Sequence, residues 1–244
     1  MYKSLMSVGG LTLLSRAAGF FRDILLGAIL GAGGLADAFV VAQRLPNHFR
    51  AIFGEGAFNS AYVPAYAQVL QAEGHARARL FSGQIFLGLL AIQLILLALA
   101  LAFTPWVIDL LAPGFRSDPA KFELTVTLTQ ITFPYLLLIT LVTLQSGTLN
   151  AHGRFAAAAF TPVLMNLTMI VFLGLSFLFS NPGLAASWGL TVSGLLQLLV
   201  TSAAAHRCGI LERFARPPMT KEIKRFLAIL GPAVIGSAGA QIAL

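Results

Sequence analysis

The sequence predicts an all-α polytopic membrane protein, in which six transmembrane helices form one lobe and a seventh helix begins. Three observations predict this fold class. Of the 244 residues, 57% are hydrophobic and only 10% are charged, whereas about a quarter of the residues of a typical soluble domain are charged. Apolar runs recur along the whole chain, and most are longer than the ~20 residues that cross the hydrocarbon core of a bilayer. The basic residues stand mainly in the short connections between these runs, as in polytopic membrane proteins.

The apolar runs predict the helices in order. The first covers about 5–30 and ends at a glycine-rich break. The second, 36–70, is longer than one crossing, so we expect it to bend, tilt or protrude, and Pro46 is the expected bend because proline removes a backbone donor. A polar link at 71–79 precedes the third run. The later runs are expected at 80–111, 124–149, 155–179, 184–205 and 226–244.

These runs divide the chain into three parts. Residues 1–205 are predicted to form an N-terminal six-helix transmembrane lobe. Residues 206–225 form a basic cytoplasmic connection, and 226–244 begin the seventh helix. This last run is barely long enough to cross a bilayer and no polar anchor follows it, so we expect a truncated chain.

The distribution of lysine and arginine predicts the orientation. With a cytoplasmic N-terminus, ten of the sixteen basic residues fall on inside segments and only Arg116 and Lys121 fall on outside loops. Cytoplasmic loops carry an excess of positive charge, so the N-terminus is predicted inside. The inside residues are Lys3, Arg77, Arg79, Arg154, Arg207, Arg213, Arg216, Lys221, Lys224 and Arg225.

The functional hypothesis rests on residues 15–64, where seven ionisable residues interrupt the first two apolar runs. They are Arg16, Arg22, Asp23, Asp37, Arg44, Arg50 and Glu55. Charges inside a bilayer are costly and usually face a bundle interior or a watery path. Four arginines face three carboxylates, so at least one guanidinium is available for an anion, and its planar fork suits phosphate oxygens. Ser15, Arg44 and Asn47 are further candidates to line such a cavity.

Helical geometry orders these charges. At 100° per residue, Arg16 and Asp23 share one face of the first helix, and Arg22 points away from both. Asp37 and Arg44 lie on one stripe of the second helix, together with Glu55 if that helix is straight. Two such stripes on adjacent helices predict a polar groove between them. In the alternative interpretation the charges pair with each other and lock the helices together, and Asn47 or Asn166 then serve only as interhelical hydrogen-bonding groups.

Other functions are not indicated. The single Cys208 and the four histidines show no metal-ligand spacing, and no nucleophile, base and orienting group occur together, so neither an enzyme nor a metal or other cofactor is expected. The formal charge of +7 is not gathered into a patch interleaved with aromatics, which argues against nucleic acid.

Several blocks of residues carry a family resemblance. They are Ser15-Arg16, Gly19–Asp23, Ala36–Phe39, Leu45–Asn47, Arg50, Phe53–Phe58 and Val63-Pro64, with later matches at Leu111–Phe115, Phe133–Tyr135, Leu149-Asn150, Arg154-Phe155, Ala159–Pro162, Asn166, Gly231–Ala233 and Gln241. This order of charges, glycines and prolines resembles the MurJ (MviN) lipid II flippase family of the multidrug/oligosaccharidyl-lipid/polysaccharide exporter superfamily.

The resemblance implies a bacterial inner-membrane protein of two six-helix lobes plus two further helices, of which this chain is the first lobe and the start of the next helix. Its substrate would be lipid II, the undecaprenyl-pyrophosphate-linked peptidoglycan precursor, flipped between leaflets by alternating access. The partners would be membrane lipids and the missing C-terminal lobe. Cavity positions carried over are Arg16, Arg22, Asp23, Asp37, Arg50 and Glu55. The alternatives are export of another lipid-linked oligosaccharide or of drugs, and a membrane scaffold without transport.

Overall fold

The structure is a computed structural model that describes residues 2–54 and 57–214, and these consist of helices and short turns without a strand. The all-helical prediction is therefore confirmed, and four helical segments are long and apolar enough to cross a membrane: 58–102, 119–151, 155–174 and 182–207. The elements are α1 (Tyr2–Leu30), α2 (Gly34–Gly54), α3 (Ala57–Ala102), α4 (Thr104–Leu111), η1 (Pro113–Ser117), α5 (Pro119–Thr132), α6 (Pro134–Ala151), α7 (Phe155–Gly174), η2 (Ser176–Leu178) and α8 (Pro182–Arg207).

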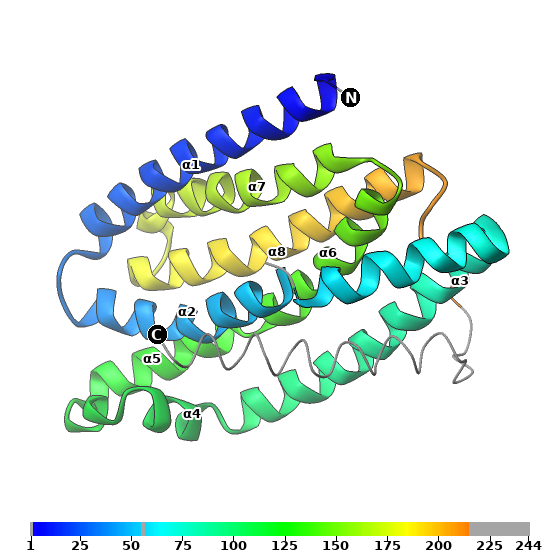
Figure 1. Ribbon diagram of the computed structural model, residues 1–244. Coiled ribbons are helices and arrows are strands. Elements are labelled where there is room, and N and C mark those ends of the chain that lie inside the picture. The colour runs from blue at the N-terminus through cyan, green and yellow to red at the C-terminus, as the bar shows by residue number, and fades with distance from the viewer. Residues whose placement is uncertain (1, 55–56, 215–244) are drawn as a thin grey trace.

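The helices run roughly alongside one another as a single bundle (Figure 1). α7 packs against both α1 and α8, and α6 packs against α8 and α3. α2 packs mainly against α5 and α6 rather than against α1. The turns at 31–33, 112–118 and 175–181 lie at one end of the bundle, and the bend of α3, the α6–α7 turn and the end of α8 lie at the other (Figure 1).

α3 is a helical hairpin whose bend lies inside the expected polar link at 71–79, although most of that link is helical. Helical structure continues on both sides of Gly74, whose φ of 79° lies in the left-handed region that glycine adopts most readily. The two arms fold back on each other (Figure 1), so that Tyr62 Oη donates to Ser82 Oγ at 2.8 Å and the Tyr62 and Phe81 rings stack at 6.3 Å. One glycine therefore replaces a linker between the second and third predicted runs.

The other run boundaries differ where proline or glycine intervenes. The predicted run 36–70 is divided between α2, which continues through the buried Pro46, and the first arm of α3. The run 80–111 is divided at Phe103 between α3 and α4. The run 124–149 lies within α5 and α6, which meet at Phe133 because Pro134 has no N–H for the helical ladder. The predicted seventh helix, 226–244, lies outside the described residues.

The interior of the lobe is rich in small polar side chains, especially on α6. Thr140, Thr143 and Thr148 are buried and donate to backbone carbonyls one turn earlier on the same helix, at 2.8–3.2 Å. Small residues permit close helix contact where lipid supplies no hydrophobic driving force. At Gly147, for example, a Cβ would lie 2.7 Å from Asn59 Oδ1.

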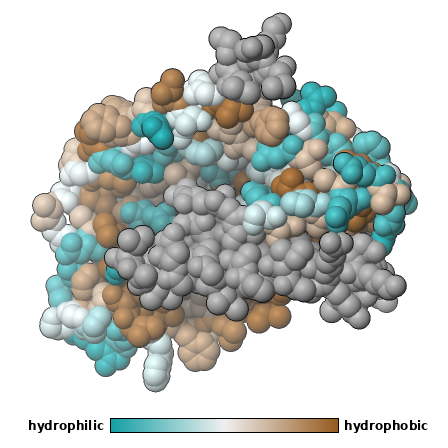
Figure 2. Space-filling view, in the orientation of Figure 1, coloured by the Kyte–Doolittle hydropathy of each residue, from teal (hydrophilic) through white to brown (hydrophobic). Residues whose placement is uncertain are grey.

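Large apolar side chains lie on the outside instead. Trp106 and Leu110 are 76% and 84% exposed, and Leu13, Phe20 and many other apolar residues are also exposed. Hydrophobic residues are visible at the surface in Figure 2, where they lie beside polar ones. Such a surface is typical of a protein whose solvent is lipid.

Candidate functional site

Arg22 and Asp23 form an ion pair at the interface between α1 and α7. Arg22 donates from Nε and Nη2 to Oδ1 of Asp23, at 2.9 and 2.7 Å, and from Nη1 to Oδ1 of Asn166 on α7, at 2.8 Å. Asn166 in turn donates from Nδ2 to the backbone carbonyl of Ser15, at 2.9 Å. The Arg22 side chain is 21% exposed and that of Asp23 is 62% exposed. The guanidinium is thus oriented by two helices, while its carboxylate partner stays accessible.

The helical-face prediction explains this arrangement. Arg22 lies on the face of α1 that packs against α7, whereas Arg16 and Asp23 lie on the exposed face. Gly19, one turn before Arg22, allows α7 to approach, because a Cβ there would lie 3.3 Å from the amide nitrogen of Asn166. The sequence therefore predicts the face of each charge, but it does not identify Asn166 as the partner of Arg22.

Asp37 has a separate partner on α5. Lys121 Nζ lies 2.6 Å from Asp37 Oδ2 and 4.1 Å from the centroid of the Phe115 ring. Sequence reasoning placed Lys121 in an outside loop and missed this contact. No local signal could reveal it, because the two residues are 84 positions apart.

The remaining candidate residues differ in their exposure and in whether the structure describes them. Arg44 is exposed on α2, and Ser15 and Asn47 are half-buried. Arg50 lies in the C-terminal part of α2, and Glu55 lies outside the described residues. The ion pairs of Arg22 and Asp37 do not join α1 to α2, since one lies within α1 and the other links α2 to α5. Along α1 and α2, the described charges at Arg16, Asp23, Asp37 and Arg44 are exposed.

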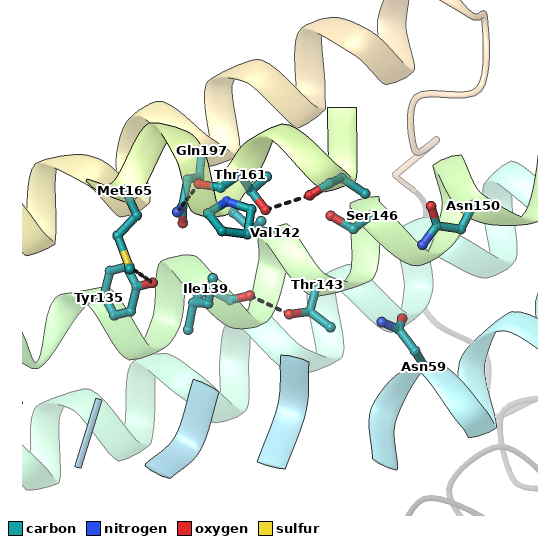
Figure 3. Close-up of a pocket in the computed structure, with 12 residues that line it drawn as sticks. Asn59, Tyr135, Ile139, Val142, Thr143, Ser146, Asn150, Thr161, Met165 and Gln197 are labelled. Carbon is teal, nitrogen blue, oxygen red and sulfur yellow. Dashed lines mark hydrogen bonds between the residues drawn. The ribbon is translucent and has the colours of Figure 1, made fainter. Parts of the chain in front are cut away.

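A neutral polar cavity of about 300 Å³ lies inside the lobe, between α3, α6, α7 and α8 (Figure 3). Gln197 donates from Nε2 to the carbonyl of Thr161 at 2.8 Å. Within the described residues, the side-chain oxygens of Asn59, Asn150 and Gln197 are buried without a hydrogen-bond partner. Buried amide oxygens normally bind water when protein donors are missing. None of the described residues that line this cavity is charged, so the lining does not suit a pyrophosphate.

The segment after α8 is held tightly on α3. Arg79 Nε donates to the carbonyl of Leu211 at 2.7 Å, and the Arg213 backbone N–H donates to the carbonyl of Arg79 at 3.1 Å. Gly83 permits this close approach, because a Cβ there would lie only 2.2 Å from the carbonyl oxygen of Arg213. The described part of the predicted basic connection is therefore docked on the lobe up to Phe214.

Glu212 is the buried acid of this segment and was not singled out from the sequence. Its Oε2 accepts a hydrogen bond from Gln145 Nε2 at 3.3 Å, and Gln145 Oε1 accepts from Thr201 and Ser202. Oε1 of Glu212 has no partner among the described residues. Burial raises the pKa of the Glu212 carboxyl above its ordinary value. In the same described part of the chain, no three His, Cys, Asp or Glu residues are grouped to hold a metal ion.

This bundle has the fold of one half of a longer helical membrane protein. An outward-facing multidrug resistance MATE family transporter of the MOP superfamily aligns with 99% of the chain at a TM-score of 0.75 and 16% identity, and 54% of that chain is covered. At this identity the likeness shows the fold alone.

The family follows from closer matches. The family model described as lipid II flippase MurJ matches residues 26–244. A probable lipid II flippase MurJ of Rhizobium meliloti (strain 1021) is 42% identical over all of this chain and 46% of its own length. A solved lipid II flippase MurJ in an inward closed conformation has a TM-score of 0.80 at 26% identity, covering 96% of this chain and 48% of its own. The chain belongs to the lipid II flippase MurJ family and spans about half the length of the relatives it matches.

The resemblance found in the sequence is thereby confirmed. Membership in this family, together with the apolar helices, places the chain in the bacterial inner membrane, as predicted. The family is one of lipid II flippases, which are transporters rather than catalysts.

Proposed function

We propose that this chain forms the first half of a transporter that moves lipid II from the inner to the outer leaflet by alternating access. The observation that carries the proposal is the exposed charge on α1 and α2 in a lobe that exposes many large apolar side chains. Arg16, Asp23, Asp37 and Arg44 all face outward from the described bundle. Charges on membrane helices are tolerated where they border a hydrated space or another protein surface. We infer that this face borders the substrate path and that a second lobe, corresponding to the other half of the relatives' length, closes it.

The proposed crossing pattern has six segments. They are α1, α2 with the first arm of α3, the second arm of α3, α5 with α6, α7, and α8. The ends of the bundle support a cytoplasmic N-terminus. The end at which α1 begins carries five arginines and two glutamates, in the segments 73–79, 152–154 and 206–213 (Figure 1). The other end carries two basic and four acidic residues, in the segments 31–37, 103–123 and 175–183. Positive charge marks the cytoplasmic side.

In this proposal the arginines replace the water of hydration around the pyrophosphate. Arg22 is pre-oriented by Asp23 and Asn166, so little side-chain entropy remains to be lost when an anion binds. Arg16, which lies on the exposed face two turns from Asp23, would offer a second guanidinium along the path. Charge-assisted, bidentate contacts of this kind are the strong ones. The carboxylates keep the guanidinium groups apart and oriented, and the lipid tails stay in the bilayer.

Complementation in a bacterial strain depleted of its own flippase tests this function. The full-length protein is compared with its Arg16→Ala and Arg22→Ala variants. Arg77→Ala serves as the matched control, because Arg77 pairs with Glu73 at the bend of α3 and lies outside the charged stretch of α1 and α2. We expect wild type and the control to restore growth and the two cavity variants to fail at equal membrane levels.

Two further measurements separate substrate binding from folding. Arg22→Gln retains a donor for Asn166 but removes the charge, so it should be inserted and folded yet inactive. The detergent-extracted Arg22→Gln variant should show a melting temperature close to that of wild type. Restoration of growth by all arginine variants would remove these residues from the substrate path. Failure of wild type to restore growth would point instead to another substrate within the same superfamily.

A further inference from the structure

A second basic site lies at the arginine-rich end of the bundle, away from the charges of α1 and α2. It is a pocket of about 410 Å³ formed where the α3 bend, the α6–α7 turn and the segment after α8 meet. Its polar lining comes from His75 and Arg79 of α3, His152 and Arg154 of the turn, and the stretch 208–210. Three segments that are distant in the sequence thus build one cavity.

The pocket has positive charge and no acid in its lining. Arg79 is fixed at its wall by the 2.7 Å hydrogen bond from Nε to the carbonyl of Leu211. The Arg154 side chain is exposed and, within the described residues, takes part in no hydrogen bond or ion pair, while its backbone N–H donates to the carbonyl of Leu149 at 2.9 Å. The nearby acids are engaged elsewhere: Glu73 pairs with Arg77 at 3.1 Å, and Glu212 is buried against Gln145. The Arg154 guanidinium therefore has no carboxylate partner among the described residues, whereas Arg79 lies within electrostatic reach of the buried Glu212.

The histidines and the helix terminus add to this character. The His75 and His152 rings stack with centroids 5.6 Å apart, and His152 Nε2 lies 3.0 Å from Tyr66 Oη. Burial, and secondarily the neighbouring His75, lower the pKa of His152. α7 begins at Phe155, directly after Arg154, and the N-terminus of a helix carries partial positive charge.

We propose that this pocket binds the phosphate group of an anionic phospholipid at the cytoplasmic surface of the membrane. Basic pockets between transmembrane helices on this side are suited to anionic headgroups. The pocket opens at the end of the bundle that carries five arginines against two glutamates, so an anionic leaflet would supply its ligand. A soluble phosphate offers the same chemistry, and the experiment distinguishes the two sources. The proposal does not depend on the identity of the transported substrate.

The test measures lipid bound to the full-length protein. Purified protein is incubated with phosphatidylglycerol, with neutral phosphatidylcholine, or with inorganic phosphate, and bound ligand is measured by native mass spectrometry or with radiolabel. Arg154→Gln removes the unpaired guanidinium, and Arg207→Gln is the matched control, because Arg207 is exposed at the same end but does not line the pocket. Cys208→Asp places a negative charge in the pocket, and Cys208→Ser is its neutral control.

We expect wild type to bind phosphatidylglycerol in preference to phosphatidylcholine. Loss of one charge-assisted contact should weaken this binding about tenfold in Arg154→Gln, and Cys208→Asp should weaken it at least as much. Arg207→Gln and Cys208→Ser should stay within about twofold of wild type. Binding of inorganic phosphate with the same dependence on Arg154, without preference for the anionic lipid, would retain the phosphate site but refute the lipid source. Equal losses in Arg154→Gln and Arg207→Gln would overturn the pocket in favour of general surface charge.

Discussion

Replacement of Gly83 by alanine should release the segment that follows α8. A Cβ at Gly83 would lie 2.2 Å from the carbonyl oxygen of Arg213, more than 1 Å short of ordinary contact, and 2.8 Å from its carbonyl carbon. Both partners are backbone, so no side-chain rotation relieves the clash. A shift of this size breaks the 3.1 Å hydrogen bond from the Arg213 N–H to the Arg79 carbonyl.

The energetic terms set the expected size of the effect. Overpacking costs about 1–3 kcal/mol, and the lost hydrogen bond about 0.5–1.5 kcal/mol. The higher helix propensity of alanine returns about 1 kcal/mol. The net loss of about 0.5–3.5 kcal/mol in the docking of 210–214 corresponds to amide exchange faster by about 2- to 400-fold.

Hydrogen–deuterium exchange of the full-length protein in detergent measures this release. Gly88→Ala is the matched control, because Gly88 lies on the same helix and a Cβ there would meet nothing within 4 Å. We expect the control to exchange at 210–214 as slowly as wild type. Gly83→Ala with unchanged exchange in this segment would refute the close backbone approach.

Three further predictions concern buried polar groups. Tyr62→Phe removes contacts to Ser82 (2.8 Å) and Thr148 (2.7 Å) and should cost about 1–3 kcal/mol in denaturant unfolding; an unchanged midpoint would contradict this. The raised pKa of Glu212 means that the folded state binds more protons above pH 4.5, so docking should weaken as pH rises from there, and Glu212→Gln should abolish that dependence in exchange experiments. Asn166→Ala removes the hydrogen bonds to α1 and should expose α1 to proteolysis about tenfold faster than wild type, whereas equal rates would show that apolar contacts alone hold α1.

Helix formation in this protein follows from local properties of the sequence. A backbone in lipid must satisfy its own hydrogen bonds, so long apolar runs such as that of α7 predict helices directly. Periodicity also predicted that Arg22 lies on a different face of α1 from Arg16 and Asp23. The run boundaries were less predictable, because the polar composition of 71–79 resembles a loop. In the structure, Gly74 alone makes the bend and its neighbours remain helical.

The partners of the charged residues depend on tertiary structure. Arg22 bonds to Asn166 across 144 positions, and Asp37 pairs with Lys121 across 84. The basic pocket joins Arg79, Arg154 and the stretch after α8, none of which is close to the others in sequence. Apolar periodicity determines which face of a helix is buried, because it acts over one or two turns. Only helix packing decides which distant side chains meet, because that choice depends on the close approach of small residues such as Gly19 and Gly83 to one particular neighbour.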